Sequence, residues 1–151
     1  MTWIRNYQIV QSSTKAADEY IPNEYGKKLE EFLQSCRLAN PRTIPVFMTF
    51  SLPYSEYQSP RELAYWDRMQ NGQGCAYAAA VVVRKHNEKM IEVAHKQGIP
   101  ILDTQPFLQN CPDFFLDSCH LTQTGNRILA HVMAEYVLHS YAQGYLTPKN
   151  E

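Results

Sequence analysis

The sequence has neither a strong excess of one charge nor a long apolar run. Its 14 Lys and Arg and 15 Asp and Glu give a formal net charge of -1 and a pI near 6.5. The basic residues are scattered, so the positive patch typical of proteins that bind nucleic acid or anionic membranes is missing. The longest apolar run, Cys75 to Val83, falls far short of the roughly 20 residues that span a bilayer. We therefore expect no nucleic acid partner, no membrane span, and a small-molecule ligand.

Paired cysteines and a secretory signal are also missing. No apolar segment follows the charge near Met1, so the printed chain carries no signal, and a cytoplasmic protein is expected if Met1 is the genuine start. The four cysteines form no CxxC pair and lack histidines at metal-ligand spacing, so neither a metal nor another cofactor is expected. A disulfide between Cys111 and Cys119 is conceivable, but free thiols in a reducing compartment are favoured.

Length and composition favour a single domain over residues 1–151, since 44% hydrophobic residues suffice to fill one core. Apolar residues at helical spacing predict helices over residues 23–39 and 78–97, the second ending at Gly98. A third helix is predicted from the cap residue Thr122 to about Gly144. Its predicted buried face comprises Ile128, Leu129, Val132, Met133, Tyr136 and Val137.

Two short apolar runs, Ile44–Phe50 and Ile99–Asp103, predict strands covered on both faces, as in parallel sheets. A strand at Trp3–Val10 and a loop at Ser12–Asp18 are further expectations, and a short helix is expected from Pro60. The alternation of helix and strand predicts a parallel α/β sheet with right-handed crossovers. Ligands of such folds bind beyond the carboxyl ends of the strands.

Asp117 and His120 stand three residues apart, just before the last predicted helix. A carboxylate and an imidazole at this spacing on a turn can form the orienting half of a Ser-His-Asp triad. The alternative is a capped turn with no chemical role. An imidazole with an ordinary pKa of about 6.5 accepts a hydroxyl proton at neutral pH, which suits general base catalysis.

The run Asp-Ser-Cys-His-Leu-Thr-Gln-Thr-Gly, residues 117–125, resembles the last sequence block of the SGNH, or GDSL-type, esterase and lipase superfamily. Asn87, the strand after Gly98 and Phe107 also fit that pattern, so the resemblance covers the C-terminal part, about half of the chain. It implies a three-layer α/β/α fold with a parallel sheet, flavodoxin-like, without its N-terminal strands. It also implies a hydrolase of carboxylic esters, with His120 as base and then acid and Asp117 as its orienting partner.

The family's Gly-Asp-Ser nucleophile block does not occur in this chain. Three hypotheses follow. The chain is an inactive C-terminal portion of such a hydrolase; or Ser51, which follows a predicted strand, is the nucleophile; or the chain is a silent ligand-binding or interaction module. Candidate substrate-binding residues come from the aromatic segment 51–74, namely Tyr54, Tyr57 and Trp66. A sheet with few strands leaves an edge bare, which predicts self-association through that edge.

Overall fold

A computed structural model describes residues 14–69 and 75–144 of the chain. The predicted strand at Trp3–Val10 lies outside these residues. In chain order the elements are α2 (Asn23–Ala39), β1 (Phe47–Met48), α3 (Pro60–Met69), α4 (Ala76–Gln97), β2 (Ile101–Leu102), α5 (Gln105–Leu108), the 3-10 helix η1 (Pro112–Phe114) and α6 (Gln123–Ala142). Residues 14–19 are helical as well, so the loop predicted over Ser12–Asp18 is wrong where it can be compared.

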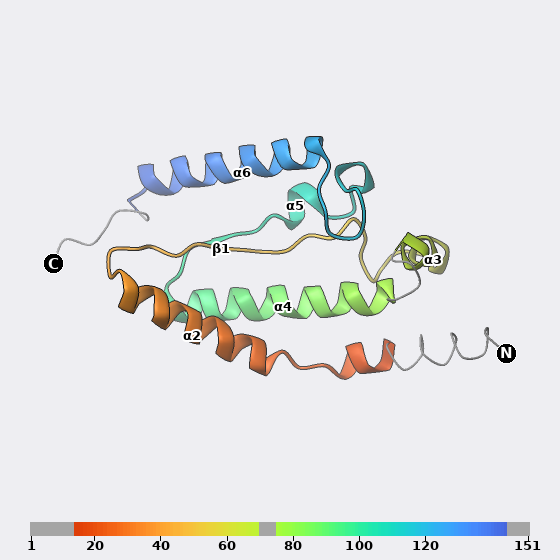
Figure 1. Cartoon of the computed structure of the whole chain (residues 1–151), viewed down its shortest axis with the longest axis horizontal. Helices are drawn as coiled ribbons and strands as arrows, with labels where there is room; N and C mark the ends of the chain where they lie inside the picture. The colour runs from red at the N-terminus through yellow and green to blue at the C-terminus, as the bar shows by residue number, and fades with distance from the viewer. Residues whose placement is uncertain (1–13, 70–74, 145–151) are drawn as a thin grey trace.

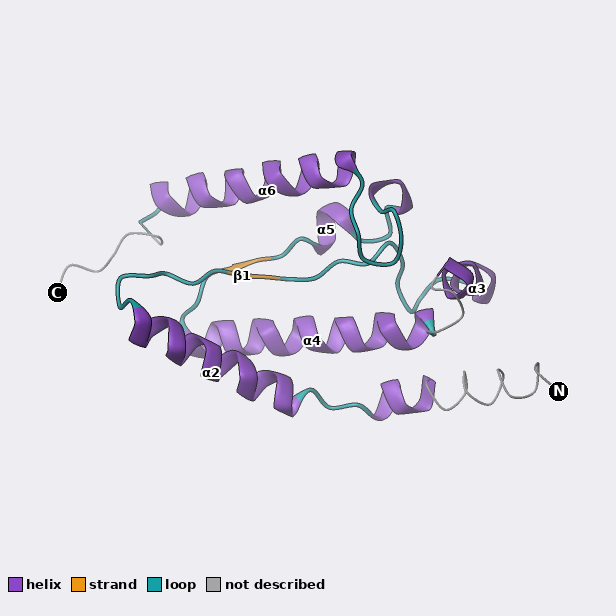
Figure 2. Cartoon of the chain, in the orientation of Figure 1, coloured by secondary structure: helices purple, strands orange, loops and turns teal. Residues whose placement is uncertain are grey.

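The two strands run through the middle of the molecule, between helices on either side (Figures 1 and 2). On one side α2 and α3 both pack against α4, and on the other α6 packs against α5 and η1. Within the described part of the chain, no helix is long and apolar enough to cross a membrane.

The predicted three-layer α/β/α fold is wrong for the described residues, which are mostly helical. Their sheet has two short parallel strands, with Phe47 opposite Ile101 and Met48 opposite Leu102. Extended segments become a sheet only where a neighbouring backbone supplies hydrogen bonds. Across residues 14–69 and 75–144 only these two segments pair in parallel, so the predicted layered sheet does not form.

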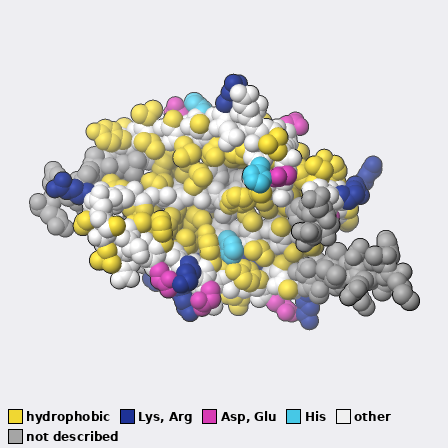
Figure 3. Space-filling view, viewed as in Figure 1, with side chains coloured by type: hydrophobic (Ala, Val, Ile, Leu, Met, Phe, Trp, Pro, Cys, Tyr) yellow, Lys and Arg dark blue, Asp and Glu magenta, His cyan; other side chains and the backbone are white. Residues whose placement is uncertain are grey.

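Strand β1 is covered on one face, whereas the sequence predicted burial on both. Phe47 and Thr49 are buried, but Val46 and Met48 are each 39% exposed and Phe50 is 46% exposed. Residues alternate between the two faces of a strand, so the exposed set shares one face. Figure 3 shows hydrophobic side chains across the middle of this view and charged side chains mainly near its outline.

Within the described residues, two groups of buried hydrophobic side chains pack together. The first joins α2, α4 and the strands and contains Leu33, Phe47, Val93, Ala94 and Ile99. The second lies between α3, α4 and the segment after β1 and contains Leu52, Tyr54, Trp66, Ala76 and Ala80. Full burial of one large apolar side chain is worth about 1.5–3 kcal/mol, so these groups hold α2 and α3 on α4.

The predicted long helices are confirmed, with small differences at their ends. Helix α2 has the predicted bounds, although its N-cap is Pro22 and no side chain caps it. Helix α4 begins two residues early and ends at Gly98, whose φ of 62° is the left-handed conformation that glycine adopts without strain. Helix α3 begins at Pro60, as predicted.

The apolar face of α6 is only partly covered. Met133 is 44% exposed and Val137 is 50% exposed, although both belong to the predicted buried face. The helix packs on the short elements α5 and η1, which are too small to cover all of its twenty residues. Met133 and Val137 therefore remain open to solvent.

Candidate functional site

The Asp117 turn is a small closed loop between η1 and α6. An antiparallel bridge joins Phe115 to Leu121 at its base, and the N–H of Leu116 donates to the carbonyl of His120 at 2.7 Å. The N–H of Thr122 donates to the carbonyl of Phe114 at 2.9 Å. Because Phe115 is also buried, the base of the loop is anchored in the interior while its tip faces solvent.

Helix α6 begins close against this loop. The hydroxyl of Thr122 accepts a hydrogen bond from the N–H of Gly125 at 3.2 Å, which confirms the predicted N-cap. A Cβ on Gly125 would lie 2.3 Å from the carbonyl oxygen of Phe114. The helix can approach the loop this closely only because residue 125 has no side chain.

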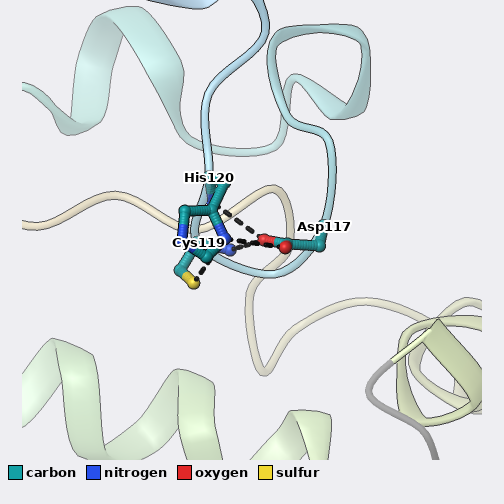
Figure 4. A group of neighbouring side chains, drawn as sticks. All are labelled: Asp117, Cys119 and His120. Atoms are coloured by element: carbon teal, nitrogen blue, oxygen red, sulfur yellow. Dashed lines mark hydrogen bonds and ion pairs between the residues drawn. The ribbon is translucent and has the colours of Figure 1, made fainter.

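Asp117 and His120 point toward one another from the ends of the loop tip (Figure 4). Asp117 Oδ1 accepts the backbone N–H groups of Cys119 and His120, each at 2.8 Å. Its other oxygen, Oδ2, lies 2.7 Å from His120 Nδ1. One carboxylate therefore both shapes the turn and holds the imidazole, the pairing predicted from the sequence.

The hydrogen bonds to Asp117 favour its charged form. The N–H groups of Cys119 and His120, together with the His120 imidazole, hold the pKa of the Asp117 carboxyl well below its ordinary value. An ionised carboxylate only accepts hydrogen bonds, so His120 Nδ1 must be the donor. In the neutral imidazole, Nε2 then carries the lone pair. Within the described residues Nε2 has no hydrogen-bond partner, and the His120 side chain is 73% exposed.

Cys119 lies beside this pair, and the sequence predicts no role for it. Its Sγ is 3.5 Å from His120 Nδ1, while partial burial and the Asp117 charge raise the pKa of the thiol. The three potential ligand atoms of Asp117, Cys119 and His120 lie within 4.8 Å of one another. CxxC spacing does not identify this group of possible ligands, because it consists of one Cys, one His and one Asp in a single turn. All four cysteines are free thiols, as favoured.

Ser51, the candidate nucleophile, lies in a buried hydroxyl network at the carboxyl ends of the two strands. Its Oγ is 3.0 Å from Thr104 Oγ1, and only 7% of the residue is exposed. Thr104 in turn donates to the carbonyl of Thr49 at 2.7 Å, and Thr49 donates to Asp103 at 2.7 Å. Among the described residues no serine hydroxyl is hydrogen-bonded to His120. The fold brings Asp117 and His120 together and gives Ser51 other partners.

Asn87 has a structural role that its sequence position did not reveal. It is almost fully buried in α4, and its amide accepts from the N–H of Phe50 at 2.9 Å and donates to the carbonyl of Phe50 at 2.7 Å. A side-chain amide that bonds both groups of one residue takes the place of a neighbouring strand. Asn87 thus ties the end of β1 to α4.

The predicted substrate-binding aromatics occupy different environments. Tyr54 is fully buried, Trp66 is 6% exposed, and their ring centroids are 5.3 Å apart in the second core group. Tyr57 is 83% exposed. Tyr54 and Trp66 are therefore core residues, whereas the side chain of Tyr57 is accessible to a ligand from solvent.

No protein-family model matches the chain, and neither a curated protein nor a solved structure proved similar to it. The resemblance to the SGNH superfamily therefore depends only on the sequence pattern of the C-terminal part, from Asn87 to Gly125.

Proposed function

We propose that this chain supplies the acid–base half of a carboxylic ester hydrolase of the SGNH type, with His120 as the base and Asp117 as its partner. The observation that carries the proposal is the 2.7 Å contact between Asp117 Oδ2 and His120 Nδ1 on a turn anchored at both ends. Such a contact sets the tautomer of the imidazole and leaves its second nitrogen free to accept a proton.

The proposed chemistry follows from that tautomer. His120 Nε2 takes the proton of a hydroxyl group as its oxygen attacks the ester carbonyl, and the imidazolium then gives this proton to the departing alcohol. Asp117 remains ionised throughout and stabilises the positive imidazolium. Its low pKa supports this role, because a carboxyl that stays charged cannot take the proton itself.

The identity of the attacking hydroxyl distinguishes the proposed hydrolase from the alternative of a catalytically silent module. Ser51 is buried and its hydroxyl pairs with Thr104, which favours the alternative of a catalytically silent ligand-binding or interaction module. Water, or a serine supplied from outside the described residues, would keep the acid–base role of His120. Removing the nucleophile from a triad usually lowers the rate by many orders of magnitude, so any remaining turnover is expected to be slow.

Hydrolysis of p-nitrophenyl acetate by the purified chain tests the acid–base role. The comparison uses wild type, His120→Ala and Asp117→Asn, with His131→Ala as the matched control, since His131 is an exposed histidine on α6. We expect His120→Ala to remove most of the turnover and Asp117→Asn to lower it by roughly tenfold or more, because the carboxylate orients the imidazole. His131→Ala should leave the rate unchanged.

A different pattern contradicts the proposal. The chain has five histidines, and an unspecific imidazole reaction would be shared among them, so equal small losses in His120→Ala and His131→Ala would remove the special role of the turn. Labelling with a fluorophosphonate, followed by peptide mapping, tests Ser51 separately. A label on Ser51 that disappears in His120→Ala would identify Ser51 as the nucleophile. Absence of both turnover and label would support the silent module.

A further inference from the structure

The Asp117 turn holds three different metal-binding side chains within four consecutive residues. Asp117, Cys119 and His120 come from one loop tip, and each offers a ligand atom within 4.8 Å of the other two (Figure 4). Thiolate, imidazole and carboxylate are the ligand types that zinc takes in proteins. A single ion could therefore contact all three without a rearrangement of the backbone.

The distance between the sulfur of Cys119 and the nitrogen of His120 matches that of a tetrahedral zinc site. With Zn–S bonds of about 2.3 Å and Zn–N bonds of about 2.0–2.1 Å, the sulfur and nitrogen of a tetrahedral site lie about 3.5 Å apart. Cys119 Sγ and His120 Nδ1 are 3.5 Å apart. The oxygen and nitrogen of such a site lie about 3.3 Å apart, so Asp117 Oδ2, now at 2.7 Å from Nδ1, would move outward by about half an ångström.

The carboxylate has room for this movement. The side chains of Asp117 and His120 are 42% and 73% exposed, so both are open to solvent at the turn. Asp117 Oδ1 already accepts both backbone N–H groups of the turn, which leaves Oδ2 as the metal ligand. The loop shape that positions Cys119 and His120 would therefore be kept when the ion binds.

From this geometry we propose that the turn binds a zinc-class divalent cation through Asp117 Oδ2, Cys119 Sγ and His120 Nδ1, with water in the fourth position. The ion takes the place of the proton on His120 Nδ1, which is lost to solvent while Nε2 gains one, and Cys119 releases its thiol proton to solvent to bind as thiolate. When Nδ1 is a ligand, the neutral imidazole carries its proton on Nε2, so Nε2 can no longer act as a base. Metal binding and the acid–base role thus exclude one another, although the binding site itself does not depend on the proposed hydrolysis.

Cobalt titration of the whole chain tests the site, because Co²⁺ takes zinc sites and its absorption spectrum reports thiolate ligation and tetrahedral geometry. The titration is made in anaerobic buffer without added thiols, on wild type, Cys119→Ser, His120→Ala and Asp117→Asn. The matched control is Cys36→Ser, a free and partly buried cysteine in α2. We expect wild type and Cys36→Ser to bind one ion with a thiolate–cobalt band that zinc abolishes. Each turn variant should bind at least about tenfold more weakly.

Two results would overturn the proposal. The first is an absence of thiolate-dependent cobalt or zinc binding by wild type at millimolar metal. The second is binding of unchanged affinity in Cys119→Ser, or a loss of binding in Cys36→Ser that matches the loss in the turn variants. Circular dichroism of each variant checks that the substitution leaves the fold intact. If Cys119→Ser does not fold, Cys119→Ala takes its place.

Discussion

The amide of Asn87 stabilises the only sheet in the described part of the chain, and its removal should weaken the whole fold. Its two hydrogen bonds, at 2.9 and 2.7 Å, satisfy the N–H and C=O of Phe50, two residues beyond the end of β1. In Asn87→Ala both backbone groups lose their partner in a site that water reaches only in part. Each lost bond costs about 0.5–1.5 kcal/mol, and the better helix propensity of alanine returns about 0.5 kcal/mol. The free energy of unfolding should therefore fall by roughly 0.5–2.5 kcal/mol.

Urea denaturation followed by circular dichroism measures this loss. With an m-value of about 2 kcal/mol per molar urea, the midpoint of Asn87→Ala should lie roughly 0.2–1.2 M below that of wild type. The matched control is Asn126→Ala, because Asn126 is also helical but exposed, and its amide makes one long contact of 3.3 Å to Leu121. This control should stay within about 0.5 kcal/mol of wild type.

Equal stability of the two Asn→Ala variants would refute the role of Asn87 as a substitute strand. A lower m-value for Asn87→Ala would have a different meaning, because it would show that the end of β1 is already detached in the folded state.

Three further predictions concern the Asp117 turn and the open strand. The carboxyl of Asp117 should titrate below its ordinary pKa in an NMR experiment; its stabilising effect is then present above about pH 4 and is lost as the pH falls through the lower folded value. In His120→Ala this pKa should rise only in part, since the backbone donors remain, and full recovery would contradict that cause. Gly125→Ala should lower the unfolding free energy by about 1–3 kcal/mol, because the added Cβ clashes with the backbone carbonyl of Phe114. An unchanged midpoint in urea denaturation would contradict this. We expect the chain to self-associate in sedimentation runs through the side of β1 that does not pair with β2. Met48→Lys, which places a charge on the exposed face of β1, should suppress this, whereas Leu38→Lys on α2 should not; a monomer with a sharp unfolding transition would count against it.

The Asp117–His120 pair could be predicted from the sequence because all of its determinants are local. The carboxylate reaches N–H groups two and three residues ahead, and Thr122 caps the helix that follows. The role of Cys119 was missed although it lies in the same turn, because a mixed ligand set has no characteristic spacing.

The environment of Ser51 could not be predicted in the same way. Its partner Thr104 lies more than fifty positions later in the chain, so its burial depends on how the two strands meet. The exposure of Phe50 and its pairing with Asn87 also depend on how the two strands are placed relative to α4.

The sequence by itself determined the long helices, their glycine and threonine boundaries and the Asp117–His120 turn, because hydrogen bonds and side-chain contacts a few residues apart specify them. The tertiary structure alone decided how many strands pair, which face of β1 is covered and that Ser51 and Tyr54 are buried. These features depend on contacts between segments that are distant in the sequence. A short apolar run has the same local pattern whether or not a second strand lies beside it, so the pattern does not reveal the pairing.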